Sequence, residues 1–205
     1  MLYLSKGVLC KNSTTDEVRV ARGNTVITLT GLEAEIWLGG RFNMISTDDK
    51  EKCNAIRSLY DMGLAEYEDT TDETAQYQIL TRCICCPAKT SLIKKPLSKY
   101  ERIVMIWLDN AGLRLSTAEL MYLVENKVNP TDNLFYEENA QALVETIYTK
   151  DTIFDNILEN QMGHAKCRNE VVCSLLLLLS KKFIIMVLSK MIATNYGNIN
   201  SRFSF

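Results

Sequence analysis

The sequence predicts a mixed protein of the α+β class, and three observations support this prediction. Residues 2–29 alternate short β-favouring runs with turn residues, which is typical of antiparallel strands. Residues 30–62 and 98–179 contain segments whose apolar residues recur at helical spacing. The chain has 205 residues, of which 47% are hydrophobic, so it can bury the core of one large domain or two small ones.

The first 29 residues contain the predicted strands of the N-terminal half. Runs of apolar and β-branched residues occupy positions 2–4, 7–10, 17–20 and 25–29. Gly23-Asn24 separates the last two runs, and this dipeptide favours the tight turn of a β-hairpin. We therefore expect two or three antiparallel strands here.

Two helices are expected next. Thr30 and Glu33 form a capping-box pattern at the start of a short helix, which ends at Gly39-Gly40. The second helix is predicted at residues 48–62, where acidic residues at its start suit the helix dipole. Its apolar positions share one face: Cys53, Ile56, Leu59 and Tyr60.

The segment after Gly63 predicts a β-hairpin. Residues 64–68 favour a strand, the acidic residues 69–73 favour a turn, and residues 77–84 favour a returning strand. A helix followed by such a hairpin is typical of a winged-helix domain, in which the helix is the recognition helix and the hairpin is the wing.

A basic segment divides the chain. Pro87 and Pro96 bracket it, and residues 87–102 carry 5 Lys/Arg against 1 Asp/Glu, whereas both flanking parts are mildly acidic. The predicted organisation has four parts: a winged-helix-like domain with N-terminal strands at 1–86, a basic linker at 87–97, a mostly helical winged-helix-like domain at 98–190, and a flexible tail at 191–205.

The second half repeats features of the first. Ser98-x-x-Glu101 and Ser116-x-x-Glu119 are capping boxes for two helices. The segments EIWL at 35–38 and MIWL at 105–108 echo each other at helix ends, which favours two related units. Further helices are expected at 137–148, 152–161 and 169–179, followed by a strand at 183–188.

Composition predicts a reduced, cytoplasmic protein that does not span a membrane. The seven cysteines form an odd set without a regular framework, which argues against disulfides. The N-terminus lacks the pattern of a secretory signal. Lys181-Lys182 interrupts the most hydrophobic stretch, 171–188, and each charge at a bilayer centre would cost on the order of 2.5–3.5 kcal/mol.

No motif for catalysis or cofactor binding occurs, so we expect a protein that is not an enzyme, has no catalytic residue and needs no cofactor. His164 and Cys167 lack the second ligand pair of a zinc site. On a strand, Cys83 and Cys85 would share one face and Cys86 the other, leaving one exposed thiol and poor geometry for a metal. We therefore predict no metal site.

DNA binding by a transcriptional regulator is one hypothesis for function. Helix 48–62 would enter the major groove, where Lys50, Asn54, Arg57 and Ser58 could reach base edges, and the basic linker would contact phosphates. The predicted nucleic-acid-binding residues are Lys50, Lys52, Asn54, Arg57, Lys94 and Lys95, with Arg57 the candidate for guanine. However, the predicted wing carries five acids, at 66, 68, 69, 72 and 73, which would repel phosphates.

The order of elements in residues 2–68 resembles that of the PqqD-like domains. The segments that carry the resemblance are LSKGVL at 4–9, VRV at 18–20, VITLTGLEAEIWLGG at 26–40 and LYDMGL at 59–64. This family of winged-helix relatives binds the leader segment of a ribosomally made peptide, which adds as a strand to the edge of the N-terminal sheet, against the third helix. The chain departs from the family because residues 40–48 are too short for a full middle helix and residues 98–190 have no counterpart.

The resemblance implies a set of peptide-binding residues. Val18, Val20 and Ile27 would lie near the binding edge, and Ile56 and Tyr60 would line the groove. Strand addition needs only backbone groups and apolar contacts, so an acidic surface does not oppose it. We therefore favour a peptide or protein partner over DNA, with a homodimer as a further possibility.

Overall fold

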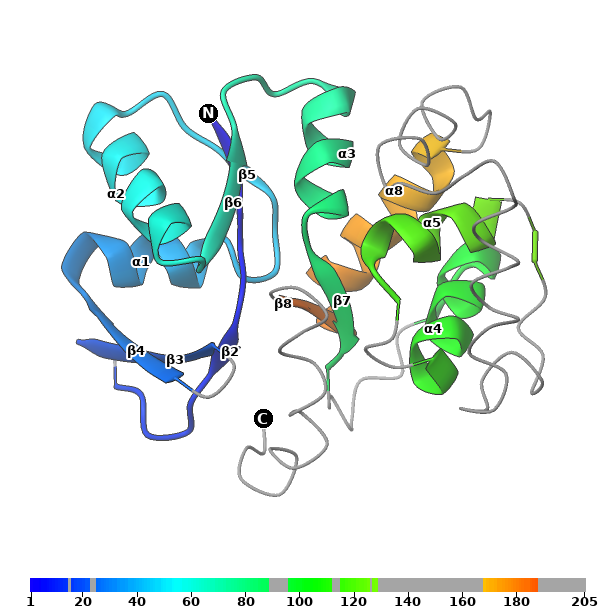
Figure 1. Cartoon of the computed structure of the whole chain (residues 1–205), viewed down its shortest axis with the longest axis horizontal. Helices are drawn as coiled ribbons and strands as arrows, with labels where there is room; N and C mark the ends of the chain where they lie inside the picture. The colour runs from blue at the N-terminus through cyan, green and yellow to red at the C-terminus, as the bar shows by residue number, and fades with distance from the viewer. Residues whose placement is uncertain are drawn as a thin grey trace.

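The computed structural model describes residues 1–14, 16–22, 25–88, 96–111, 115–125, 127–128 and 168–187 (Figure 1). Within these ranges the chain is mixed helix and strand, which confirms the predicted α+β class. The helices predicted at 137–148 and 152–161 lie outside the described residues, as do Lys94, Lys95, His164, Cys167 and the tail 191–205.

The N-terminal elements follow the chain as β1 (Leu2–Ser5), β2 (Val8–Leu9), β3 (Glu17–Arg22), β4 (Thr25–Thr30), α1 (Gly31–Gly39), β5 (Ile45–Ser46), α2 (Lys50–Asp61) and β6 (Ala65–Glu68). The elements that follow are α3 (Glu73–Thr81), β7 (Ile84–Pro87), α4 (Lys99–Ala111), α5 (Thr117–Glu125), α8 (Arg168–Ser180) and β8 (Ile184–Val187).

The strand β1 forms the centre of a sheet with the order β5-β1-β6, antiparallel on both sides. Successive side chains of a strand point to opposite faces. Tyr3 accordingly packs into a core with α1 and α2, while Leu2 and Leu4 pack into a second core with helices of the C-terminal half. In Figure 1 this sheet stands between α1 and α2 on one side and α3 on the other.

The strands β2, β3 and β4 form a separate antiparallel sheet in that order. The β3–β4 hairpin pairs Arg22 with Thr25 and Glu17 with Thr30, which confirms the hairpin predicted around residues 23–24. Gly7, at the bend between β1 and β2, has a φ of +114°. A Cβ there would lie 2.6 Å from Val20 Cγ1, so only glycine fits this bend.

The two N-terminal helices begin differently. Asp49 caps α2, because its side chain accepts hydrogen bonds from the backbone N–H groups of Glu51 and Lys52. The capping box predicted at Thr30 is wrong, since the Thr30 side chain makes no cap hydrogen bond. Glu33 instead accepts a 2.7 Å hydrogen bond from Ser58 Oγ, which ties α1 to α2.

The predicted wing is wrong. Residues 77–84 do not return as a strand, because α3 occupies residues 73–81, and β6 pairs with β1 instead. The Asp72 side chain caps α3 by accepting from Ala75 N. Tyr77, Ile79 and Leu80 are buried, so tertiary packing favours the helix over the β propensity of this segment.

The C-terminal half is mostly helical, and its predicted capping boxes are confirmed. Ser98 N donates to Glu101 Oε2 while Glu101 N donates to Ser98 Oγ, and Ser116 and Glu119 repeat this reciprocal pair. The predicted helix 169–179 and the strand after it appear as α8 and β8. Trp107 lies in the core, whereas its neighbour Ile106 is 44% exposed.

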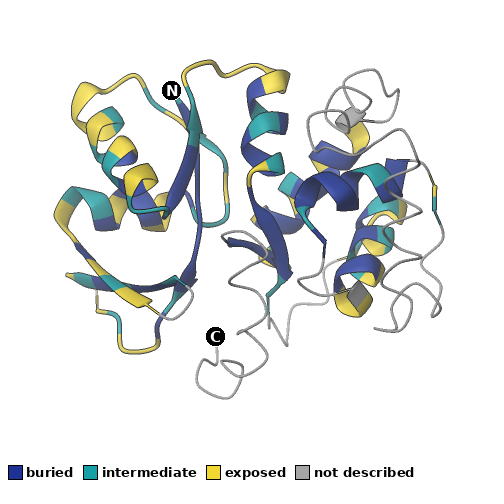
Figure 2. Ribbon diagram, in the orientation of Figure 1, coloured by how far each residue is buried: buried dark blue, intermediate teal, exposed yellow. Residues whose placement is uncertain are grey.

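The two halves meet through β7 and β8. The strand β7, which the predicted boundary at residue 86 splits, pairs antiparallel with β8. Gly7 N donates a 2.9 Å hydrogen bond to Met186 O of β8. One face of this pair packs against β2 and β3 in a third small core, which contains Val8, Ala21, Ile84 and Ile185. Figure 2 shows β7 and β8 coloured as buried over most of their length. Nowhere in these ranges is a helix both long and apolar enough for a bilayer crossing.

The adjacent glycines at the end of α1 give a matched test of this packing. A Cβ on Gly40 would lie 2.6 Å from Tyr3 Cε2 and closer still to Ser5 Oγ, whereas a Cβ on Gly39 would meet its neighbours at 3.5 and 3.6 Å. We predict that Gly40→Ala lowers the free energy of unfolding by about 1–3 kcal/mol through overpacking. Gly39→Ala should leave it unchanged or raise it by up to about 1 kcal/mol. Urea denaturation of both variants measures the difference, and equal effects would contradict the packing described here.

Candidate functional site

The strand β4 lies at the end of its sheet, and no described backbone group pairs with its outer edge. Its sequence, TVITLT, holds no charge and no proline. Natural edge strands are usually shielded by charges, prolines, bulges or a covering element, because an open edge can pair with another chain. The edge of β4 therefore offers a template on which an extended segment can add as a strand.

The pairing between β2 and β3 fixes the direction of the backbone groups in β3. Cys10 N donates a 2.8 Å hydrogen bond to Arg19 O, so the backbone groups of Arg19 face away from β4. Because these groups alternate in direction along an antiparallel strand, those of Val18 and Val20 face β4.

The register then identifies the free groups of β4. Val18 and Val20 lie opposite Leu29 and Ile27, which use their backbone groups toward β3. Thr28 lies between these two residues and Val26 precedes them, so Val26 and Thr28 direct their N–H and C=O groups to the open edge. An added strand would hydrogen-bond to these two residues.

The structure places four of the five residues expected to bind a peptide in one core. Val18, Val20 and Ile56 are at most 1% exposed, and Ile27 is partly buried against them. The three fully buried side chains belong to the core on which β4 packs, and Ile27 lies on β4 itself, beside the open edge. Tyr60 lies elsewhere: it is 44% exposed and meets Tyr67 of β6 edge to face, with ring centroids 5.2 Å apart.

Four of the six residues of the DNA hypothesis lie on α2. Lys50, Lys52, Asn54 and Arg57 are all exposed on this helix. Arg57 lies 3.4 Å from Asn54 Oδ1 and 4.0 Å from a carboxylate oxygen of Asp69. The helix carries cations, but no wing hairpin follows it within the described segment.

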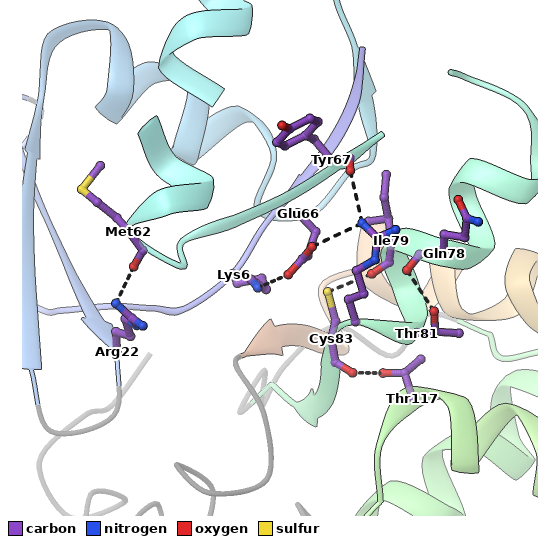
Figure 3. Close-up of polar contacts among 11 residues, drawn as sticks. Lys6, Arg22, Met62, Glu66, Tyr67, Gln78, Ile79, Thr81, Cys83 and Thr117 are labelled. Atoms are coloured by element: carbon purple, nitrogen blue, oxygen red, sulfur yellow. Dashed lines mark hydrogen bonds and ion pairs between the residues drawn. The ribbon is translucent and has the colours of Figure 1, made fainter. Parts of the chain in front are cut away.

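A buried ionic network braces the sheet that holds β1 (Figure 3). Lys6 Nζ lies 2.5 Å from Glu66 Oε1, and their side chains are only 3% and 8% exposed. Arg82 approaches the other Glu66 oxygen at 3.7 Å, pairs with Glu68 and donates to Tyr67 O. The Arg82 guanidinium thus covers the outer edge of β6, in contrast to the bare edge of β4. Sequence reasoning missed this network, whose one signal is a lysine at the end of an apolar run.

A second cationic cluster lies between the two halves. Arg41 Cζ lies 5.3 Å from the centre of the Trp37 ring and 4.7 Å from that of Phe42. Lys182 Nζ lies 5.3 Å from the same Phe42 ring. Burial lowers the pKa of Arg41. The adjacent Arg41-Phe42 was a weak signal for this cluster, but nothing in the sequence connects it with Lys182.

The cysteine cluster forms core rather than a reactive site. Cys83, Cys85 and Cys86 are all buried, so the prediction of one exposed thiol is wrong. Burial raises the pKa of Cys85 to about 12, although a hydrogen bond with Thr117 opposes the shift. In the part of the chain that is described, no group of histidine, cysteine and acidic side chains could hold a metal ion.

No protein-family model, no curated protein and no solved structure matches this chain. Its function must therefore be inferred from the geometry of these residues.

Removing one partner of the buried ion pair should be costly. Lys6→Met leaves Glu66 charged in a buried position with only Arg82 nearby, so we expect the free energy of unfolding to fall by about 3–5 kcal/mol. The double variant Lys6→Met, Glu66→Leu should be less destabilised than Lys6→Met, because no buried charge is left at the two positions. Urea denaturation of the three proteins tests this, and a double variant as unstable as the single one would refute it.

Thiol labelling should separate the cysteines by burial. At pH 8, iodoacetamide should alkylate the exposed Cys173 within minutes, while Cys10, Cys83, Cys85 and Cys86 stay unmodified until the protein unfolds, because their thiolates are inaccessible and their pKa values are raised by burial. Mass spectrometry of tryptic peptides, with and without urea, gives the readout. Labelling of Cys85 in the native protein at the rate of Cys173 would contradict the fold of β7.

Proposed function

We propose that this protein is a non-enzymatic binding protein that recognises an extended segment of a peptide or protein partner by adding it as a strand to β4. The observation that carries the proposal is the uncharged, unpaired edge of β4, where Val26 and Thr28 direct their hydrogen-bonding groups outward. Main-chain hydrogen bonds give affinity in this mode of recognition, and alternate side chains give specificity.

The side chains around the edge suggest which segments would bind. On the core-facing side, Ile27 is partly buried and Leu29 is 1% exposed. On the other side, Val26 is 55% exposed. An added strand with an apolar residue beside Ile27 would extend the existing core, so the preferred ligand is an uncharged, β-branched segment.

We also propose that the chain contains two winged-helix-like units. In each unit a strand precedes the helices, and a long helix ends in a tight turn that leads into a second strand. This second strand pairs antiparallel with the first, β6 with β1 in one unit and β8 with β7 in the other. Only the first unit carries the β2–β4 sheet, so the recognition edge belongs to it.

DNA binding is the second candidate, because Lys50, Lys52, Asn54 and Arg57 are exposed together on α2. Asp48, Asp49, Glu51 and Asp61 flank or share this helix, and their charges oppose approach to phosphates. Because α3 replaces the expected wing, the usual second contact with the backbone of the duplex is missing from this segment.

Proline at position 28 tests the strand-addition proposal. Thr28→Pro removes an outward N–H and leaves the β3–β4 hydrogen bonds in place, while Thr28→Val keeps the N–H. Peptides selected from a random displayed library against the unmodified protein serve as ligands. We expect Thr28→Pro to weaken their binding on the order of tenfold, from lost hydrogen bonds and ring clash, and Thr28→Val to change it by about twofold or less.

Amide hydrogen exchange and DNA titration complete this test. Val26 and Thr28 amides should exchange rapidly in the free protein and become protected with peptide. A monomer–dimer equilibrium that Thr28→Pro abolishes would instead identify a second copy as the added strand. Two results together would refute strand addition and favour DNA. The selected peptides would bind Thr28→Pro as tightly as the unmodified protein, and the unmodified protein would bind duplex DNA at high salt while Arg57→Gln would not.

A further inference from the structure

The turns that follow α2 and α8 have the same hydrogen-bond pattern but a different residue at the position of positive φ. After α2, Gly63 N donates to Tyr60 O and Leu64 N to Leu59 O, and Gly63 has a φ of +70°. After α8, Lys182 N donates to Leu179 O and Phe183 N to Leu178 O, and Lys182 has a φ of +66°. A lysine therefore occupies a position that favours glycine.

This lysine has a conformational cost. A residue with a Cβ is less stable in the left-handed region than in the right-handed region, and such outliers tend to mark functional sites. The Lys182 side chain reaches toward the other half of the chain, with Nζ 5.3 Å from the Phe42 ring. Arg41 lies over the same ring, so cations from two distant segments converge on it.

The Arg41 guanidinium has no counter-charge among the described residues. No ion pair or hydrogen bond satisfies it, and its Nε is buried without an acceptor. The Ser5 hydroxyl is a second buried group without a partner, in a residue that is 2% exposed. It lies against Gly40, which directly precedes Arg41. A buried donor without an acceptor destabilises the folded protein, and a bound acceptor would relieve that cost.

We propose that Arg41 and Lys182 form a binding site for an oxyanion, the phosphate or carboxylate group of a small ligand, with the unpartnered Ser5 hydroxyl against the adjoining Gly40. The guanidinium makes cation–π contacts with the Trp37 and Phe42 rings, which restrain its planar fork for two parallel hydrogen bonds to an oxyanion. Lys182 is exposed, so the ligand reaches the site from solvent on that side. This site is independent of strand addition at β4.

Anion titration of the full chain tests the proposal. Sodium phosphate and sodium acetate are titrated separately, with ionic strength held constant by sodium chloride, and the midpoint of thermal unfolding is followed. We expect a saturable rise in the midpoint, because a ligand that binds only the folded state stabilises it. A response to phosphate alone identifies a phosphate ligand, and one to acetate alone a carboxylate. No saturable response to either would overturn the proposal.

Two variants locate the site. Lys182→Gly removes a cation from a position where glycine is favoured, so it should fold at least as stably as the unmodified protein while its anion affinity falls on the order of tenfold. Arg41→Gln should abolish the saturable response. Lys99→Gln, which removes an exposed lysine elsewhere, should leave affinity within about twofold. Unchanged anion affinity in Lys182→Gly would overturn the proposal. If Arg41→Gln fails to fold, the anion affinity of Lys182→Gly alone tests the proposal.

Discussion

The burial of β1 on both faces is the constraint on which the rest of the fold depends. Tyr3 enters the core of the N-terminal half, whereas Leu2 and Leu4 enter the core that α3, α4, α5 and α8 share. A strand with two buried faces is mostly apolar and must have its edges satisfied, and here β5 and β6 satisfy them. The two halves therefore share one strand, so neither core is complete without it.

This arrangement explains the buried charges and the exposed edge together. The chain leaves β1 through Lys6 and Gly7, and Lys6 meets its partner Glu66 because Ser5 pairs with Ala65 in the register of β1 and β6. The bend at Gly7 then carries β2, β3 and β4 into a separate sheet. The far edge of that sheet lies outside the shared layer, which leaves β4 unpaired while the edge of β6 is covered by Arg82.

Local signals in the sequence predicted the elements that local chemistry determines. The β3–β4 hairpin follows from β-branched runs and a turn dipeptide, and two capping boxes are formed as expected at Ser98 and Ser116. The helix α3 was missed because Tyr77 and Ile79 favour strands, and only contacts with distant helices select the helix. Helical periodicity also placed the exposed polar residues of α2. The open edge of β4 and the convergence of Arg41 and Lys182 depend on pairings between distant segments, which no local pattern contains.

The paired turns after α2 and α8 show how one local geometry can serve two purposes. At Gly63 a Cβ would lie 3.0 Å from the Arg22 guanidinium carbon, and Arg22 donates a 2.7 Å hydrogen bond to Met62 O. The first turn therefore receives an arginine from β3, which would have to shift to make room for a Cβ at Gly63. The second turn carries Lys182, whose Nζ lies 5.3 Å from the centre of the Phe42 ring. Glycine is required where the turn anchors the β2–β4 sheet, while lysine at the same backbone position provides a cation at the junction of the two halves.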